Sequence, residues 1–247
     1  MTTLIAELPP LRRIDSINNY LGMVGNVVDY ITHIDIPDST FASPSANSVL
    51  IGALIRHRFS NVEVMANIRI ADHNKVGLTA LIMGGLANGI RSYLLMRGDL
   101  GPGVTAVTDL TPVSAIEYLR STEQVNEARL GVSISSFDEN YIRDRLRVKP
   151  DFAMLQYTLS MDDLRKVAII SREYGIDVYP PLLIITSKSA RTIGRILNME
   201  ITAKPDPVGD ALERARELLQ YFPGIYLSSP GDFNSIIEVA RALRKYL

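Results

Sequence analysis

The sequence of 247 residues contains no cysteine, which excludes disulfides, thiolate metal sites and a cysteine nucleophile. It also lacks an excess of charge of either sign. Lysine and arginine number 26 and aspartate and glutamate 27, so the formal net charge is −1. Proteins that bind nucleic acid or membrane surfaces usually carry a basic face, so neither partner is expected.

Long apolar runs are also missing. The first residues hold no basic segment followed by an apolar run, so no signal peptide is predicted. No apolar stretch is long enough to cross a bilayer. These observations predict a cytoplasmic protein without a membrane partner.

Three common kinds of site have no counterpart in the sequence. The histidines, His33, His57 and His73, are scattered and none is spaced from another as a ligand pair, so no metal site is predicted. No Gly-x-Ser-x-Gly turn and no Ser–His–acid order indicate a serine nucleophile. The first turn, Pro9-Pro10-Leu11, has no phosphate-binding glycines, which argues against a Rossmann nucleotide site.

Short apolar runs alternate along the chain with longer amphipathic ones. The predicted strands are residues 4–8, 29–34, 62–66, 92–96, 130–134, 152–155, 177–185 and 224–227. The predicted helices are residues 18–28, 48–57, 75–87, one that begins near 112, 138–147, 162–174, 189–197, 207–221 and 233–246. This pattern predicts that residues 1–247 form a single α/β domain, a (β/α)₈ TIM barrel, and an open doubly wound sheet is the alternative.

Polar side chains follow the predicted strands, where the carboxyl ends of barrel strands form one rim. They are Glu7, Asp35, Asn67, Arg69, Asp72, Asn74, Arg97, Asp99, Ser133, Ser135, Ser136, Gln156, Tyr157, Ser228 and Ser229. The most informative group is Arg97-Gly98-Asp99, which places a cation, a bare backbone and a carboxylate within reach of one ligand. The alternative interpretation of this tripeptide is an ordinary polar turn.

Several runs carry a resemblance to a known family. They are residues 28–37 (Val-Asp-Tyr-Ile-Thr-His-Ile-Asp-Ile-Pro), Asp72-His73-Asn74, Gly89-Ile90 followed by Leu95-Met96-Arg97-Gly98-Asp99, Thr108-Asp109-Leu110, and residues 151–156. In this order and spacing they resemble the methylenetetrahydrofolate reductase family, whose members are (β/α)₈ barrels that use FAD. The match is best from residue 29 to residue 109 and thinner after residue 150.

The resemblance implies a reaction and assigns roles. Family members transfer a hydride from reduced flavin to the methylene carbon of a folate-type carrier and form the methyl carrier. Glu7 would be the acid that opens the bridged ring, and Asp99 would stabilise the cationic intermediate beside the flavin. Gln156 would bind the pterin edge, so the substrate residues implied are Glu7, Asp99 and Gln156. NAD(P)H is the implied electron donor.

The resemblance also implies a cofactor site. Arg97, Gly98 and Asp99 would contact the flavin. Other residues placed at the cofactor are Asp35, Asn67, Asp72 and Ser135, with Arg145 or Lys149 as the basic residue of a later helix.

The sequence departs from the family pattern at several of these positions. Glu7-Leu8-Pro9-Pro10 is one residue shorter than the family's Glu-x-x-Pro-Pro. Because neighbouring strand residues face opposite ways, Ala6 would then hold the acid's place and Glu7 would point outward, unless a bulge compensates. Asn67 replaces a histidine and Ile34 a flavin-binding threonine, and the segment Tyr-Pro-x-x-His-Pro is missing after residue 134.

These departures keep two functions open. The first is the reductase reaction, with FAD or, instead, FMN, a deazaflavin or a flavin shared with a partner subunit. The second is a barrel homologue without reductase activity that binds the carrier or serves as a subunit of a larger one-carbon complex. A folate-type or other pterin-type ligand is expected in either case, and the chain could act as a homo-oligomer.

Overall fold

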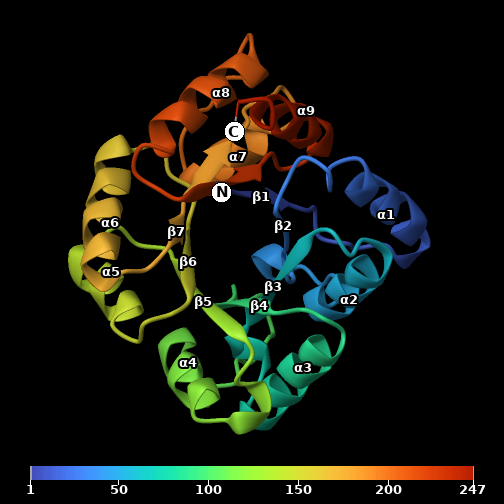
Figure 1. Cartoon of the computed structure of the whole chain (residues 1–247), viewed down its shortest axis with the longest axis vertical. Coiled ribbons are helices and arrows are strands. Elements are labelled where there is room, and N and C mark those ends of the chain that lie inside the picture. The colour runs from blue at the N-terminus through green and yellow to red at the C-terminus, as the bar shows by residue number, and fades with distance from the viewer. Residues whose placement is uncertain (1, 247) are drawn as a thin grey trace.

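Parallel strands form a barrel in the computed structural model, which describes residues 2–246 (Figure 1). The strands are β1 (Thr3–Glu7), β2 (His33–Ile36), β3 (Glu63–Arg69), β4 (Ser92–Met96), β5 (Arg129–Ile134), β6 (Phe152–Leu155), β7 (Val178–Tyr179), β8 (Pro181–Leu183) and β9 (Gly224–Ser228). In the sheet they follow the order β7-β6-β5-β4-β3-β2-β1-β9-β8. The predicted (β/α)₈ barrel is therefore confirmed.

The seventh barrel strand is interrupted at Pro180, which separates β7 from β8. β7 pairs with β6, through Val178 opposite Ala153, whereas β8 pairs with β9 on the other side. The carbonyl oxygen of Pro180 accepts a hydrogen bond from the Tyr226 amide. Proline has no N–H to donate, so this strand changes its partner where its own ladder is broken.

Helices surround the strands. They are α1 (Ile17–Gly25), α2 (Ser48–Arg58), α3 (Lys75–Ala87), α4 (Pro112–Arg120), α5 (Glu139–Leu146), α6 (Met161–Tyr174), α7 (Ala190–Leu197), α8 (Pro207–Leu218) and α9 (Phe233–Leu243). In Figure 1, α7 overlaps the strands near the centre of the view, whereas the other helices lie around the outside. No helix within residues 2–246 is long and apolar enough to cross a membrane.

Among the strand boundaries that differ from the prediction, those of β2 and β3 affect the site. β2 begins at His33 rather than at residue 29, because residues 26–30 form turns that complete the end of α1. β3 continues to Arg69, which pairs with Met96 of β4, so Asn67 and Arg69 lie within the strand and not after it. The longer β3 brings Asn67 and Arg69 into the strand, and β2 ends at Ile36, so Asp35 also lies within a strand.

Apolar side chains fill the lower interior of the barrel. This inner cluster comprises Ile5, Met65, Leu94, Phe152, Met154, Tyr179 and Tyr226. Gly131 of β5 lies against the ring of Phe152, where an added Cβ would collide with that ring. The inner cluster closes the barrel below the rim, as in barrels whose interior is packed with side chains.

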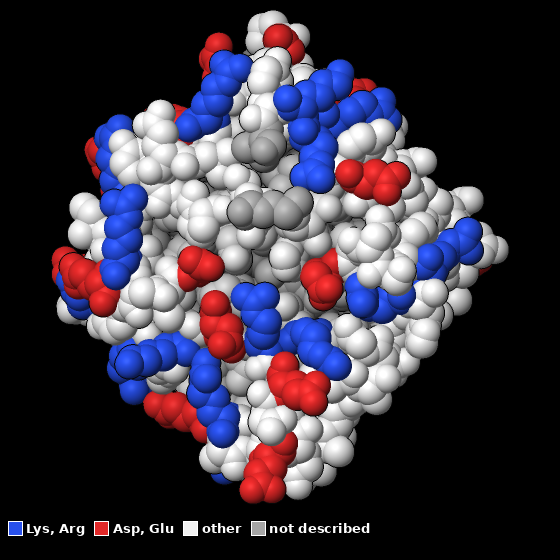
Figure 2. Space-filling model, in the orientation of Figure 1, with Lys and Arg blue, Asp and Glu red and all other residues white. Residues whose placement is uncertain are grey.

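Charges of both signs are interspersed on the face drawn in Figure 2. Arginines there and elsewhere pair with acids of neighbouring elements, as Arg143 does with Glu173 and Arg147 with Glu117. The drawn face therefore has no large area of one sign.

Candidate functional site

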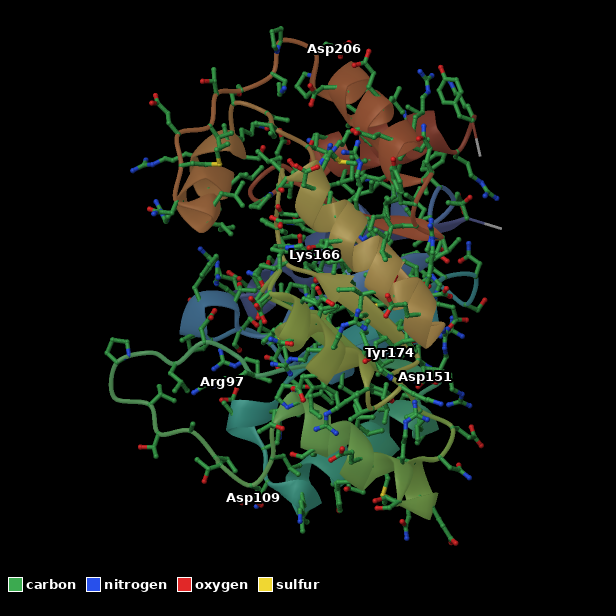
Figure 3. All side chains as sticks on the ribbon, turned by 90° about the vertical axis from the view of Figure 1, so that its left-hand side faces the viewer. Arg97, Asp109, Asp151, Lys166, Tyr174 and Asp206 are labelled. Carbon is green, nitrogen blue, oxygen red and sulfur yellow. The ribbon has the colours of Figure 1, made fainter. Side chains whose placement is uncertain are left out.

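The carboxyl ends of the strands lie on one side of the molecule. In Figure 3, Arg97, which follows β4, and Asp151, which precedes β6, lie on opposite sides. The loop between Arg97 and Asp109 projects outward on the carboxyl-end side. Ligands of TIM barrels bind at this end, so the polar side chains here form the candidate site.

Glu7 points into the barrel, which answers the question that the shortened motif left open, and the outward direction expected in the absence of a bulge is not found. Ala6 packs outside with the helices, and Glu7, one residue later, follows inward-facing Ile5 in the alternation. Its Oε2 accepts a 2.7 Å hydrogen bond from the Tyr157 hydroxyl, which is also hydrogen-bonded to Ser228 Oγ. Burial raises the pKa of Glu7, and the hydrogen bonds to Ser228 and Tyr157 offset part of that rise.

Asp35 is the neighbour of Glu7 on the next strand, in direct register. It is 2% exposed, and its Oδ2 accepts a hydrogen bond of 3.3 Å from the Asn67 amide. Burial, followed by the charge of Glu7, raises the pKa of Asp35 well above its usual range. Two acids this close hold their protons at higher pH than isolated carboxyls do.

Two buried oxygen atoms in this group lack a partner. They are Oδ1 of Asp35 and Oδ1 of Asn67, and Asn67 is 5% exposed. Buried polar atoms are nearly always hydrogen-bonded in native proteins. The pair therefore offers acceptor positions to a ligand that carries two hydrogen-bond donors.

Arg69 holds the neighbouring loops together from inside the rim. Its side chain is 4% exposed and donates to the carbonyl oxygens of Ser39, at 2.6 Å, and Asp99, at 2.7 Å. Its Nε lies 2.8 Å from Oδ2 of Asp72. Arg69 thus joins the loop after β2 to the loop after β4.

Arg97-Gly98-Asp99 is part of the same arrangement. Gly98 has φ +85° and packs on Arg69, whose side-chain atoms an added Cβ would approach to 2.9–3.0 Å. The Asp99 carboxylate accepts a hydrogen bond of 3.0 Å from the Phe41 amide, and Arg97 is exposed. In this structure the tripeptide supports a loop, and its one cation is turned to solvent.

The other predicted residues are distributed over the chain. Ser135, bonded to Tyr141, and Gln156 are exposed at the rim. Arg145 lies in the last turn of α5 and stacks on Tyr141. Lys149 lies between α5 and β6, at the amino end of that strand. The structure therefore brings Glu7, Asp35 and Asn67 together, but does not bring Lys149 to them.

Three residues of this site, although placed at the rim from the sequence, were given no role there. Tyr157 and Ser228 follow or end strands and were visible as polar rim residues, but nothing local indicated that they meet Glu7. Arg69 carried a stronger signal, since a charged residue within an apolar strand is rarely buried without a partner. Within the described residues, no group of three or more potential ligands could hold a metal.

The geometry can be compared with known proteins. No family model matches the sequence, and no curated protein matches it. Solved structures do match over nearly the whole chain. EDTA monooxygenase from Chelativorans sp. BNC1 has 11% identity and a TM-score of 0.70, covering 99% of this chain and 94% of its own.

Two further structures agree in fold. A Clostridium thermocellum protein that binds two copies of 5-methyl-5,6,7,8-tetrahydrofolic acid has 8% identity and a TM-score of 0.70. The match covers 100% of this chain and 96% of that protein. Orotidine 5'-monophosphate decarboxylase from Methanocaldococcus jannaschii has 12% identity and a TM-score of 0.61. The match covers 100% of this chain and 99% of that protein. The protein is a TIM barrel. At such low identity the likeness of these TIM barrels concerns the fold alone.

Proposed function

We propose that the protein binds a tetrahydrofolate-type one-carbon carrier at the Glu7 site and catalyses reduction of its methylene group to a methyl group. The observation that carries this proposal is Glu7, an inward-facing carboxyl at the rim whose pKa burial raises. A carboxyl whose pKa is raised holds its proton to higher pH, so it is suited to donate it to a ring nitrogen.

The unpaired acceptors fit the carrier's ring. A 2-amino-4-oxo pteridine presents an amino group and a ring N–H side by side, and each needs an acceptor. Oδ1 of Asp35 and Oδ1 of Asn67 are buried and without partners, so they can receive these donors when Asp35 is ionised. A Clostridium thermocellum barrel of the same fold binds a carrier of this type, which supports the choice.

The reaction then needs one proton and one hydride. Glu7 donates its proton to the nitrogen that leaves the methylene bridge, and the carbon–nitrogen bond breaks to give an iminium ion on the other nitrogen. A hydride adds to the methylene carbon and gives the methyl carrier, while solvent returns a proton to Glu7. Tyr157 and Ser228 hold the Glu7 carboxyl in place through hydrogen bonds.

A reduced flavin or NAD(P)H would supply the hydride, but the residues described here do not fit FAD as the resemblance implies. The edge of a flavin ring has one N–H between two carbonyl groups, so it satisfies only one of the two acceptors that Asn67 and ionised Asp35 present. Lys149 lies at the amino end of β6, away from the rim. We therefore assign no step to a bound FAD.

The experiment separates binding from chemistry. Binding of 5-methyltetrahydrofolate is measured by calorimetry, and formation of the methyl carrier is measured with reduced FMN, reduced FAD or NADH in the absence of oxygen. We expect Glu7→Gln to keep binding within about threefold and to lower the rate at least 100-fold. An unchanged rate in Glu7→Gln, or no binding by the natural protein, would refute the proposal.

A second function is favoured by the rim contacts of Asp99 and the position of Lys149. The Asp99 carboxylate accepts a hydrogen bond from the Phe41 amide and so supports a loop instead of the cationic intermediate. The alternative function is therefore that the chain binds the carrier without reducing it. Tight binding without turnover with any of the three donors would select this alternative.

A further inference from the structure

Two neighbouring helices on the outside of the barrel, α2 and α3, expose large apolar side chains. Leu50 and Leu54 of α2 are 66% and 47% exposed, and Val76 and Met83 of α3 are 77% and 44% exposed. The two helices pack against each other and lie at the lower right of Figure 1. Their outer surface is called the α2–α3 face, and it comprises Leu50, Leu54, Val76, Ala80, Met83, Gly84 and Ala87.

The α2–α3 face carries no charged side chain along its length. No Asp, Glu, Lys or Arg occurs between residues 46 and 55 or between residues 76 and 90. Val76, Ala80, Met83 and Ala87 are three or four residues apart, so they form one side of α3, opposite buried Leu78. The lower right edge of the molecule is accordingly drawn mostly in white in Figure 2. The solvent side of a surface helix is normally polar, and a continuous exposed apolar surface is typical of a protein–protein interface.

Gly84 gives a second indication that another chain covers this face. It lies within α3 and is exposed, and an added Cβ there would meet nothing within 4 Å. Gly85, in contrast, packs directly on the ring of Tyr93, which leaves no room for a Cβ. Glycine within a helix is less stable than alanine, and its usual benefit is the close approach of another backbone. The described part of the chain supplies no such neighbour for Gly84, so a second molecule is the expected one.

The two ends of the α2–α3 face carry opposite charges. His57 and Arg58 lie at the carboxyl end, where Arg58 stacks on a ring and forms no ion pair within residues 2–246. Asp109 lies at the amino end, where its carboxylate accepts a hydrogen bond from the Lys75 amide. The Lys75 ammonium is directed to the ring of Tyr118, on the side of α4. The other charged side chains near the two ends are already in ion pairs, namely Asp72 with Arg69, Arg56 with Glu63 and Arg91 with Glu127.

We infer that the α2–α3 face is the interface between two copies of this chain, packed with their helices antiparallel. A two-fold axis that crosses the helices uses the same face of both copies. It brings the end that carries Arg58 in one copy to the end that carries Asp109 in the other, and it also opposes the helix dipoles. A parallel arrangement would instead place like ends together.

The antiparallel arrangement fixes which residues meet. The middle of α3, at Ala80 and Met83, lies near the two-fold axis and faces its own counterpart, whereas Val76 of one copy faces Ala87 of the other. Because the helices begin at the carboxyl-end side of the barrel, the two rims are turned in opposite directions. Both candidate sites therefore stay accessible, and the inference does not depend on the proposed function.

The association is tested by analytical ultracentrifugation of the full chain. We expect the natural protein, of 27.4 kDa per chain, to sediment as a dimer at micromolar concentration. Leu54→Glu places a charge in the face and should raise the dissociation constant of the dimer at least about 30-fold, while circular dichroism shows an intact fold. The matched control is Ile169→Glu, at a side chain of α6 that is 60% exposed, and it should leave the dimer unchanged.

The orientation is tested by disulfide cross-linking. The chain has no cysteine, so every introduced thiol is unique. Under mild oxidation, Ala80→Cys alone should form linked dimers, and so should an equal mixture of Val76→Cys and Ala87→Cys. Val76→Cys alone should not, because the two thiols lie at opposite ends of the interface. Ile169→Cys is the control and should stay unlinked.

Several results would overturn the inference. They are a natural protein that stays monomeric, a dimer that Leu54→Glu does not weaken, and linkage of Val76→Cys alone without linkage in the mixture, which would indicate parallel helices. If the monomer instead sediments with phosphatidylglycerol vesicles and Leu54→Glu abolishes this, the face binds a membrane and the inference is wrong. Carrier binding and turnover are measured separately, so none of these results decides the proposed function.

Discussion

The Tyr157 hydroxyl donates a hydrogen bond of 2.7 Å to Oε2 of Glu7, although the two residues are 150 positions apart in the chain. The barrel brings them together because the carboxyl ends of β1 and β6 meet at one rim. This bond stabilises the ionised form of Glu7, against the effect of burial.

Removal of this bond should therefore raise the pKa of Glu7 further. In Tyr157→Phe we expect the carboxyl resonance of Glu7 to titrate at higher pH than in the natural protein, as followed by carbon NMR. Tyr246→Phe, at an exposed tyrosine, is the control and should leave the titration unchanged. A Glu7 titration that moves to lower pH in Tyr157→Phe would contradict the assignment.

Asp35 should make the stability of the protein depend on pH. Its pKa is raised in the folded state, so the folded protein binds this proton more tightly than the unfolded chain does. The contribution to stability is complete below the ordinary pKa of about 4, and is lost as the pH rises through the folded value.

Asp35→Asn removes this titration and keeps the shape of the side chain. We expect the variant to be more stable than the natural protein at pH 8, and its free energy of unfolding in urea to change less between pH 5 and pH 8. Glu213→Gln, on the exposed side of α8, should leave the pH dependence as it is. A steeper pH dependence in Asp35→Asn would refute the expected sign.

Arg69 should be the main support of the rim loops. Arg69→Ala removes hydrogen bonds to the Ser39 and Asp99 carbonyls and the contact with Asp72. We expect a loss of about 3 kcal/mol in the free energy of unfolding, and faster hydrogen exchange in residues 38–46 and 97–104. Arg97→Ala, at an exposed neighbouring arginine, should change stability by less than about 0.5 kcal/mol.

Gly98 and Gly103 provide a matched pair in one loop. Both have positive φ, +85° and +73°, but only at Gly98 would a Cβ come close to a side chain, that of Arg69. Gly103→Ala should cost about 1 kcal/mol from the backbone conformation alone. Gly98→Ala should cost about 1–2 kcal/mol more, because of the added contact with Arg69. Equal losses in thermal or urea unfolding would show that this contact is unimportant.

Asp99 should matter less to turnover than Glu7. Its carboxylate holds the Phe41 amide, so we expect Asp99→Ala to speed hydrogen exchange at Phe41 and to lower the reduction rate less than tenfold. Loss of the reaction in Asp99→Ala, with the exchange at Phe41 unchanged, would instead place Asp99 in the chemistry.

The sequence predicted the barrel well because its evidence is local. Residues 92–96 and 152–155 are strands as predicted, and the predicted helix 75–87 matches α3. The largest shifts, near His33 and Arg69, lie where turns and cross-strand pairing override the apolar pattern. Periodicity alone does not fix where pairing begins and ends.

The site was less predictable because it depends on long-range contacts. The direction of Glu7 was left open because the family motif has a different spacing, and placing Ala6 inward by that motif gave the opposite of the observed direction. Gln156 was preferred to Tyr157, although the tyrosine meets Glu7 and the glutamine is exposed. A single sequence shows which residues are at the rim, but not which of them face each other.

The break at Pro180 interrupts the hydrogen-bonded wall of the barrel. Two residues before it are held by β6 and three after it by β9, so no uninterrupted ladder crosses this strand from one neighbour to the other. The first and last strands of the barrel meet elsewhere, between β1 and β9, where Thr3 lies opposite Gly224, so the break at Pro180 is separate from that closure. The two halves of this strand are therefore held by different neighbours, and the second half leads through residues 184–189 directly into α7.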